Sequence, residues 1–296
     1  MKTFEPKGTI TAIVTPFNSD LTVDYDCFKK LIDFQIEGGV DSIVVCGSTG
    51  EAATLSAKEK MSLIITAVEH SNGRVPIIAG TGSNSTSASI DMTIIAKEHG
   101  ADAVLLVAPY YNKPSQEGLY NHFLAISEHV DIPQIIYNVP GRSGVNITPE
   151  TQIKIAENCK NVVATKEASG DLEQMMEIIK YAPQGFDLLC GDDSLTIPCV
   201  LMGGKGIISV VSNYAPKLFS KLVNLSLEGK YEEAVKINYQ LLDLMQLNFV
   251  ETNPVPVKAA MAIMGLLNEY YRLPLLPIQN ENRVKIHDAL KKVGLV

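Results

Sequence analysis

Eight short apolar runs rich in β-branched residues recur along the chain, and amphipathic helical patterns lie between most of them. The runs are Thr9–Thr15, Ser42–Gly47, Val75–Gly80, Ala103–Ala108, Gln134–Asn138, Val162–Lys166, Phe186–Gly191 and Gly206–Val211. The stretch Val104–Val107 is apolar on both faces, which is typical of a parallel strand covered by helices. Eight strand–helix units in succession favour a closed barrel over an open, doubly wound sheet. The predicted fold class is therefore α/β, a (β/α)8 TIM barrel.

The segments between these runs carry helical signals. In Asp26–Glu37 the apolar residues recur on one face of a helix, and Ser56 followed by Glu59 forms a capping box that begins a helix over Ala57–Glu69. The same reasoning predicts further helices over Ser87–His99, Gln116–His129, Pro149–Asn158 and Asp171–Tyr181.

After Ser212 the strand signals stop, while helical patterns continue to the end of the chain. These patterns cover Lys217–Glu228, Tyr231–Phe249, Val255–Leu267 and Asn282–Lys292, and no low-complexity linker precedes them. A length of 296 residues suits one barrel with an extension. We expect residues 1–212 to form the barrel with its active site, and residues 213–296 to form a helical region packed on the barrel or on a partner chain.

Composition excludes several classes of partner. The net charge of −8 argues against a nucleic-acid surface, and no apolar stretch is long enough to cross a bilayer, so no nucleic acid and no membrane are expected as partners. The N-terminal residues lack the apolar core of a signal peptide. The five cysteines are far apart and mostly within apolar runs, which predicts buried, reduced thiols and a cytoplasmic location. They are Cys27, Cys46, Cys159, Cys190 and Cys199.

Lys166 is the first candidate for chemistry, because it ends the apolar run Val162–Lys166. Burial in such a strand penalises the charged form of a lysine, so a neutral amine could exist near neutral pH and attack a ketone or aldehyde to form a Schiff base. The ordinary alternative is a strand-end lysine whose ammonium group reaches solvent. In barrels of this kind the catalytic groups lie at the carboxyl ends of strands. The side chains at the other strand ends therefore decide between a reactive amine and an ordinary lysine.

Three further strand ends carry suitable side chains. Ser48 and Thr49 lie between glycines after the second run, where backbone N–H groups can hold a carboxylate and hydroxyls can relay protons; an ordinary turn is the alternative. Tyr111 belongs to a pair of tyrosines after the fourth run, which packing explains more often than chemistry does. Tyr137 lies at the end of the fifth run, and Arg142, in the loop after it, is suited to bidentate capture of a carboxylate or to a surface ion pair.

Other features are placed less favourably. Glu167 should point away from Lys166, because side chains alternate along a strand. The sequence Gly203–Gly206 resembles a phosphate cradle, yet it precedes the last strand and so predicts a tight turn on the opposite face of the barrel. The five histidines fall in helices or at their ends and make no metal-ligand set with a strand-end carboxylate, which disfavours a metal-dependent aldolase.

At these residues the sequence resembles the class I, pyruvate-dependent aldolase/lyase family over essentially the whole chain. The stretch Asn138–Arg142 separates this branch of the family from sialic acid lyases, which lack that arginine. The resemblance rests on Gly47–Glu51, Pro109–Pro114, Tyr137–Arg142, Lys166–Gly170, Gly191–Asp193 and Gly206–Val210.

The resemblance implies a Schiff-base condensation of pyruvate with L-aspartate 4-semialdehyde, the first committed step of diaminopimelate and lysine biosynthesis, with no metal or organic cofactor. It implies that Lys166 forms the imine with pyruvate and that Tyr137 shuttles protons. Ser48 and Tyr111 would join the proton relay, with Tyr111 entering from a neighbouring subunit of a homotetramer built from two tight dimers.

The resemblance also implies the substrate contacts. Thr49, with backbone nearby, would hold the carboxylate of pyruvate, and Arg142 would receive the carboxylate of the semialdehyde. Ile208 would contribute a backbone group beside pyruvate, and Gly191 would complete the substrate-binding set.

Regulation is where the sequence departs from lysine-inhibited relatives, which carry polar side chains around a tight interface. Asn84 and Tyr110 remain, but alanines offer no acceptors for the ammonium groups of lysine, and a lysine side chain would repel them. We therefore expect weak or absent feedback inhibition by lysine. The departing positions are Ala52, Ala57, Lys60 and Ala88.

Two alternatives stay open at this point. One is a pyruvate-dependent sugar-acid aldolase or N-acetylneuraminate lyase, which shares the imine chemistry but takes another aldehyde. The other is a non-catalytic binding protein on the same barrel, whose mark would be the loss of Lys166 or Tyr137; neither residue is lost.

Overall fold

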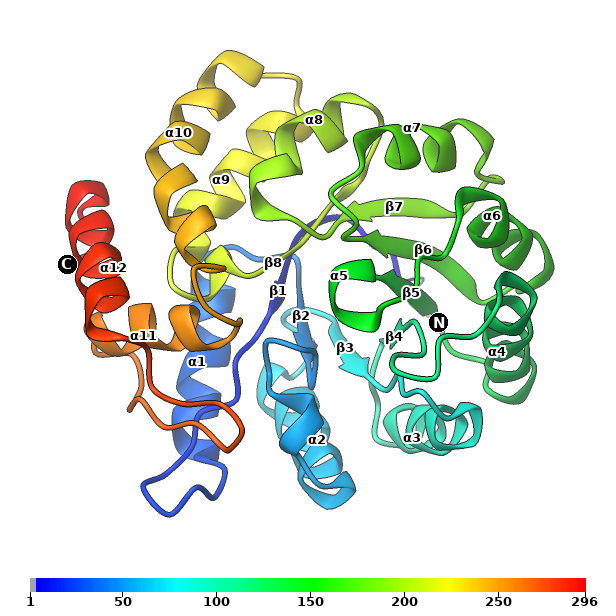
Figure 1. Cartoon of the computed structure of the whole chain (residues 1–296), viewed down its shortest axis with the longest axis horizontal. Helices are drawn as coiled ribbons and strands as arrows, with labels where there is room; N and C mark the ends of the chain where they lie inside the picture. Colours follow the sequence, from blue (N-terminus) through cyan, green and yellow to red (C-terminus); the bar gives the residue numbers. More distant parts are fainter. Residues whose placement is uncertain (1–3) are drawn as a thin grey trace.

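The computed structural model describes residues 4–296 and contains one closed barrel of eight parallel strands in chain order (Figure 1). This confirms the predicted fold class. The strands are β1 (Gly8–Ala12), β2 (Ser42–Val45), β3 (Ile77–Gly80), β4 (Ala103–Val107), β5 (Gln134–Asn138), β6 (Val162–Glu167), β7 (Asp187–Cys190) and β8 (Gly206–Ser209).

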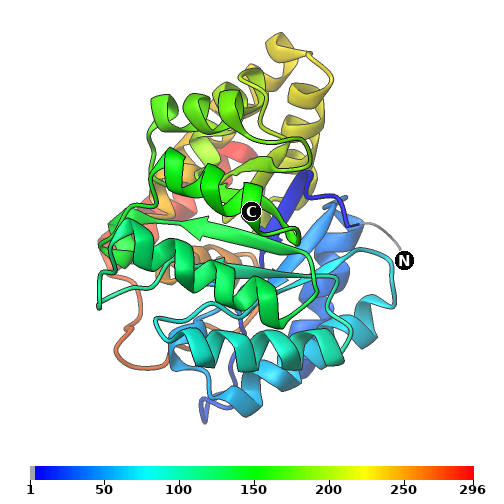
Figure 2. The same ribbon diagram turned by 90° about the vertical axis from the view of Figure 1, so that its right-hand side faces the viewer.

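Helices pack around the outside of this barrel, and Figure 2 shows those of the middle of the chain lying along the strands. They are α1 (Tyr25–Glu37), α2 (Ala57–Ser71), α3 (Thr86–Glu98), α4 (Gln116–His129), α5 (Pro140–Ser143), α6 (Pro149–Asn158), α7 (Leu172–Tyr181) and α8 (Thr196–Leu201). The capping box of α2 forms as the sequence predicts. The short helices α5 and α8 were not predicted, because each offers too few turns for a periodic pattern.

Several strands end earlier than their apolar runs, for local reasons. Cys46 has a φ of 57°, which takes the chain out of the extended conformation directly after β2. After β8, the buried carboxylate of Asp193 accepts the N–H groups of Val210 and Val211 at 3.2 and 2.8 Å, so these groups are lost to the sheet. The strand ends thus open into loops where the sequence predicted continued strand.

Two apolar cores follow from the alternation of side chains along the strands. One lies between the barrel and its helices. The other fills the barrel interior with inward-facing residues such as Ile135 and Ala164. Tyr137 and Lys166 have the same inward parity as these two residues, and they pair directly across β5 and β6. The barrel therefore places both side chains on its inner side at the carboxyl end.

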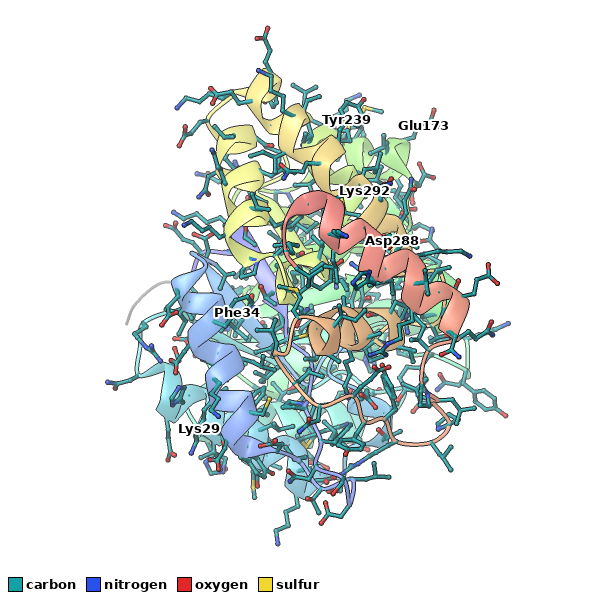
Figure 3. All side chains as sticks on the ribbon, turned by 90° about the vertical axis from the view of Figure 1, so that its left-hand side faces the viewer. Lys29, Phe34, Glu173, Tyr239, Asp288 and Lys292 are labelled. Carbon is teal, nitrogen blue, oxygen red and sulfur yellow. The ribbon has the colours of Figure 1, made fainter. Side chains whose placement is uncertain are left out.

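The C-terminal region consists of α9 (Pro216–Leu227), α10 (Tyr231–Leu247), α11 (Val255–Ile263) and α12 (Asn280–Val293). These helices gather on one side of the barrel next to α1 and α8, with α9 against β1 and α10 against α12 (Figure 1). Figure 3 shows Asp288 and Lys292 on the outer face of α12 and Tyr239 on α10. Within residues 4–296, no helix combines the length and the apolar character needed to cross a membrane.

The predicted turn before β8 is confirmed, and it supplies a test of the fold. A Cβ atom on Gly206 would lie 2.1 Å from the Gly8 carbonyl oxygen, and the φ of Gly206 is 152°. Close backbone approach and the unusual φ both require glycine there. We expect Gly206→Ala to lower the free energy of unfolding by about 3 kcal/mol or more, from strain and overpacking together.

The measurement is denaturant unfolding of the purified variant. Gly141→Ala is the matched control, since no atom lies within 4 Å of its added Cβ. Equal stability of the two variants would contradict this account of the closure between β1 and β8.

Candidate active site

Lys166 and Tyr137 stand side by side at the carboxyl ends of adjacent strands. The Lys166 Nζ atom lies 4.4 Å from the centroid of the Tyr137 ring. Only 5% of Lys166 and 7% of Tyr137 is exposed. Among residues 4–296, no carboxylate lies within ion-pair distance of this amine. The sequence-predicted nucleophile is thus largely out of water, beside a phenol that can exchange protons.

Glu167 points the other way, as the alternation along the strand predicts. Its fully buried carboxylate accepts side-chain N–H groups from Asn138 at 3.0 Å, from Gln152 at 2.9 Å and from Gln174 at 3.0 Å. These amides come from β5, α6 and α7. The network ties the end of β6 to the helices outside the barrel, and so fixes the backbone that carries Lys166.

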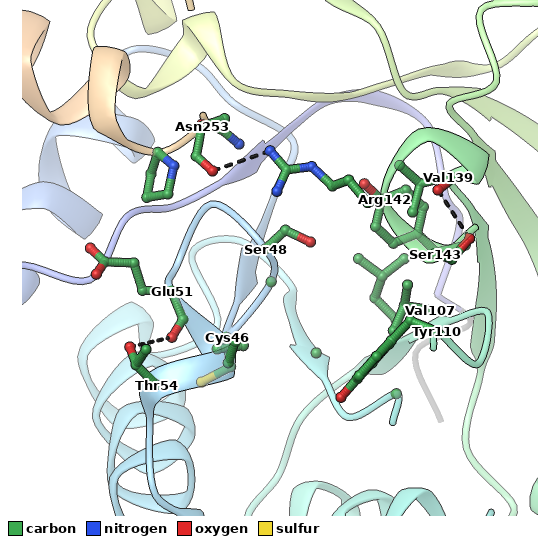
Figure 4. Close-up of a pocket in the computed structure, with 18 of the residues that line it drawn as sticks. Cys46, Ser48, Glu51, Thr54, Val107, Tyr110, Val139, Arg142, Ser143 and Asn253 are labelled. Atoms are coloured by element: carbon green, nitrogen blue, oxygen red, sulfur yellow. Dashed lines mark hydrogen bonds between the residues drawn. The ribbon is translucent and has the colours of Figure 1, made fainter. Parts of the chain in front are cut away.

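Two adjoining cavities lie over this pair. The outer cavity has a volume of about 390 Å³ and opens between the ends of β2, β4 and β5, and Figure 4 shows several of its side chains. The inner cavity has a volume of about 60 Å³ and contains Lys166. Together they can hold two small organic acids. The inner cavity is lined in part by Thr49, Tyr137, Arg142, Lys166, Gly191 and Asp192.

The charges in the inner cavity are mixed. Asp192 follows β7, and burial raises the pKa of its carboxyl while the nearby Lys166 charge opposes that rise. Arg142, on α5, directs its guanidinium group toward the cavity and donates a hydrogen bond of 3.1 Å to the main-chain oxygen of Asn253 (Figure 4). One amine, one guanidinium and one carboxylate thus share a small space.

Thr49 is buried in the loop after β2, with 3% of its surface exposed. Its hydroxyl oxygen accepts a hydrogen bond of 3.0 Å from the side-chain amide of Asn253. Ser48, which is exposed, lines both cavities. Asn253 was not predicted from the sequence, because it lies before α11 in the C-terminal region and no strand-end pattern points to it.

A buried ion pair anchors the same loop. The Lys258 ammonium, from α11, donates to the Glu51 carboxylate at 2.7 Å and to the Tyr270 carbonyl oxygen at 2.6 Å. Both side chains of the ion pair are almost fully buried. Burial lowers the pKa of Lys258, while the Glu51 charge acts against that shift. The Lys258 ammonium also lies 4.5 Å from the Phe17 ring centroid, so it is enclosed by packing.

The remaining predicted residues differ in whether they reach the two cavities. Gly191 lines the inner cavity, and a Cβ there would lie 2.3 Å from the Ala168 Cβ, so the close approach requires glycine. Ile208 is buried inside the barrel on β8, but it does not line either cavity. Tyr111 is 88% exposed and is not brought to the cavities of its own chain. In residues 4–296, no group of three histidine, cysteine, aspartate or glutamate side chains is arranged to hold a metal ion.

The model of the Dihydrodipicolinate synthetase family matches residues 5–293. The chain belongs to the dihydrodipicolinate synthetase family. It is 50% identical over 290 residues to the 4-hydroxy-tetrahydrodipicolinate synthase of Geotalea daltonii, and the aligned region covers 98% of this chain and 99% of the relative. This likeness extends over the barrel and the C-terminal region alike.

Two solved structures of this dihydrodipicolinate synthetase family bear on ligands. The dihydrodipicolinate synthase from Acinetobacter baumannii, complexed with pyruvate, has a TM-score of 0.96 and 43% identity, and covers 98% of this chain and 99% of its own. The enzyme from Cyanidioschyzon merolae, with lysine bound, has a TM-score of 0.95 and 40% identity, with the same two coverages.

Only part of the predicted regulatory set lies at the outer cavity of this family member. Ala52, Lys60 and Tyr110 line it, whereas Ala57 and Ala88 do not. The ammonium-bearing side chain of Lys60 therefore lies at the cavity wall, where another cation is disfavoured.

The buried ion pair of this dihydrodipicolinate synthetase family member gives a second prediction. Lys258→Met should lower the free energy of unfolding by about 3–5 kcal/mol, because it leaves the Glu51 carboxylate buried without a counter-charge. The double variant Glu51→Gln/Lys258→Met should recover part of this loss. Denaturant unfolding of both single variants and the double variant measures the coupling, and strictly additive losses would contradict the account.

Proposed function

We propose that the chain condenses pyruvate with L-aspartate 4-semialdehyde, and so acts as a 4-hydroxy-tetrahydrodipicolinate synthase in diaminopimelate and lysine biosynthesis. The observation that carries the proposal is the buried Lys166 amine facing Tyr137 in a small cavity. Membership of the family over the whole chain supports it.

The first step is imine formation. The neutral Lys166 amine adds to the keto carbon of pyruvate, and the carbinolamine then loses water to leave a protonated imine. Tyr137 is the group beside Lys166 that passes protons, with the Ser48 hydroxyl as the next member of the relay. Thr49 receives the pyruvate carboxylate, which its place on the wall of the inner cavity supports.

The second step forms the carbon–carbon bond. The protonated imine withdraws electrons, so the pyruvate methyl group gives a proton to the Tyr137 relay and becomes the nucleophilic carbon of an enamine. As this carbon bonds to the aldehyde carbon, the aldehyde oxygen takes a proton back from the relay to become a hydroxyl, and the protonated imine to Lys166 is restored. Arg142 holds the semialdehyde carboxylate by a charge-assisted contact and brings the aldehyde carbon to the enamine. Gly191 keeps the wall beside Lys166 free of a side chain, and the Ile208 backbone lies on the neighbouring strand β8.

The third step releases the product. The amino group of the condensed substrate attacks the imine carbon, a new C–N bond forms, and the C–N bond to Lys166 breaks. Both protons of that amino group end on the Lys166 nitrogen, which leaves as an ammonium group with a cyclic imine as product. This step requires no oxidant or reductant.

The proposal extends to the assembly, a homotetramer of two tight dimers in which Tyr111 enters the cavity of a neighbouring subunit. Tyr111 is 88% exposed, and its φ of 73° is a costly conformation for a bulky residue. A strained, exposed tyrosine next to the cavity mouth suits a contact made across an interface.

Reductive trapping tests the imine. Borohydride added with pyruvate should attach one reduced pyruvate to the peptide that contains Lys166, and Lys166→Arg should abolish both the adduct and turnover. Peptide mass mapping makes the measurement. Lys205→Arg is the matched control, because Lys205 lies in the turn before β8 at the other end of the strands. This variant should give the same adduct on Lys166 as the wild type. An adduct on the buried Lys258 instead would overturn the assignment.

A substrate comparison separates this proposal from a sugar-acid aldolase. Pyruvate consumption should be rapid with L-aspartate 4-semialdehyde and slow with glyceraldehyde or N-acetylmannosamine. The reverse order would assign the chain to the other activity.

Lysine should not inhibit this enzyme at sub-millimolar concentrations, because Lys60 places a like charge at the outer cavity and Ala52 offers no acceptor there. Initial rates measured against a lysine titration, at fixed pyruvate and semialdehyde, give the answer. A half-maximal effect at a lysine concentration below about 1 mM, which corresponds to a binding free energy of about 4 kcal/mol, would refute the prediction.

A further inference from the structure

We infer that Asn253 is a positioning residue that orients the two carboxylate-binding groups of the active site, the Thr49 hydroxyl and the Arg142 guanidinium. It fixes the hydroxyl of Thr49 as a hydrogen-bond donor toward pyruvate and holds the guanidinium of Arg142. The inference rests on the proposed function, and it adds a residue from outside the strand ends to the machinery.

The geometry of Asn253 joins two elements that are far apart in the sequence. Its side-chain Nδ2 donates to the Thr49 Oγ1 at 3.0 Å, and its main-chain oxygen accepts from Arg142 at 3.1 Å. Only 5% of Asn253 is exposed, and it lines both cavities. Figure 4 shows it beside Arg142 at the cavity wall. One residue therefore touches the loop after β2 and the helix α5 at once.

The direction of the first hydrogen bond decides what Thr49 can do. A threonine hydroxyl has one proton to donate and accepts through its oxygen. Because the Asn253 amide occupies the oxygen as a donor, the hydroxyl proton is left for another acceptor. Thr49 has no acceptor for that proton among the hydrogen bonds of residues 4–296, and it faces the inner cavity. A pyruvate carboxylate, which only accepts, is the matching partner.

The segment that carries Asn253 is held rigidly enough for this role. Lys258, one turn into α11, is locked to Glu51 at 2.7 Å, and Glu51 lies two residues after Thr49. The main-chain N–H of Arg272 adds a long contact of 3.5 Å to the same carboxylate. The loop after β2 and the start of α11 are therefore joined at two points, Thr49–Asn253 and Glu51–Lys258.

Reversing the hydrogen bond gives a sharp test. In Asn253→Asp the new carboxylate can only accept, so the Thr49 hydroxyl donates to it and not to pyruvate. We expect the KM for pyruvate, and the concentration of pyruvate needed for half-maximal imine trapping, to rise by about tenfold or more, the range for loss of a hydrogen bond to a charged group. Asn268→Asp, which adds the same charge at an exposed position, should leave both values unchanged.

A double-mutant cycle separates positioning from a simple charge effect. In a Thr49→Val background, which has no hydroxyl, Asn253→Asp should raise the pyruvate KM by less than about twofold, within the usual limit for independent effects. The Thr49→Ser variant, which keeps a hydroxyl, should retain the full sensitivity to Asn253→Asp. Far-UV circular dichroism and unfolding midpoints check that each variant folds.

Three outcomes overturn the inference. An unchanged pyruvate KM in Asn253→Asp means that the Thr49 hydroxyl already donates to the asparagine. An equal rise with and without the Thr49 hydroxyl means that repulsion of pyruvate by the new charge is the cause. A loss of stability with no change in pyruvate affinity means that Asn253 is only structural. Borohydride trapping of the wild type on Lys166 tests the proposed function separately, so the two failures are distinguishable.

Discussion

The pairing of β5 with β6 is the constraint on which the site depends. In a closed parallel barrel, residues in register on adjacent strands share the inner or the outer side, and Tyr137 is in register with Lys166. A shift of one residue would exchange Lys166 with Glu167, and would place a carboxylate in the cavity and an amine among the outer amides. The network of Asn138, Gln152 and Gln174 around Glu167 opposes such a shift, because it satisfies the carboxylate only outside the barrel.

A buried ion pair, Glu51–Lys258, joins the C-terminal region to the loop after β2. A buried ion pair such as Glu51–Lys258 is a weak source of stability, since removing two charges from water costs about as much as their attraction returns. Its value here is geometric: the pair can form only when α11 and the loop after β2 are in one arrangement. That arrangement brings Asn253 to Thr49 and Arg142. The helical extension is therefore joined to the chemistry of the barrel by polar contacts as well as by apolar packing.

The sequence predicted the barrel and the candidates Lys166, Tyr137 and Arg142 because two local rules suffice: strand alternation, and the gathering of strand ends at one face. It did not predict Asn253, whose contact with Thr49 spans 204 positions and depends on how the C-terminal region docks. Glu51 and Lys258 were missed for the same reason. The catalytic and binding roles of all the site residues stay predictions. Those of Tyr111 and Ile208 came from the family resemblance alone, since a single chain cannot supply a neighbour's tyrosine and Ile208 lines neither cavity. The helices α5 and α8 were overlooked because one or two turns carry no period.

A crystal structure of the protein frozen in the presence of pyruvate would show whether Lys166 forms the imine. We expect continuous electron density from the Lys166 Nζ to the second carbon of pyruvate, with the pyruvate carboxylate within hydrogen-bond distance of the Thr49 hydroxyl. Density for free pyruvate with an unmodified Lys166, or density joined to a different lysine, would contradict it.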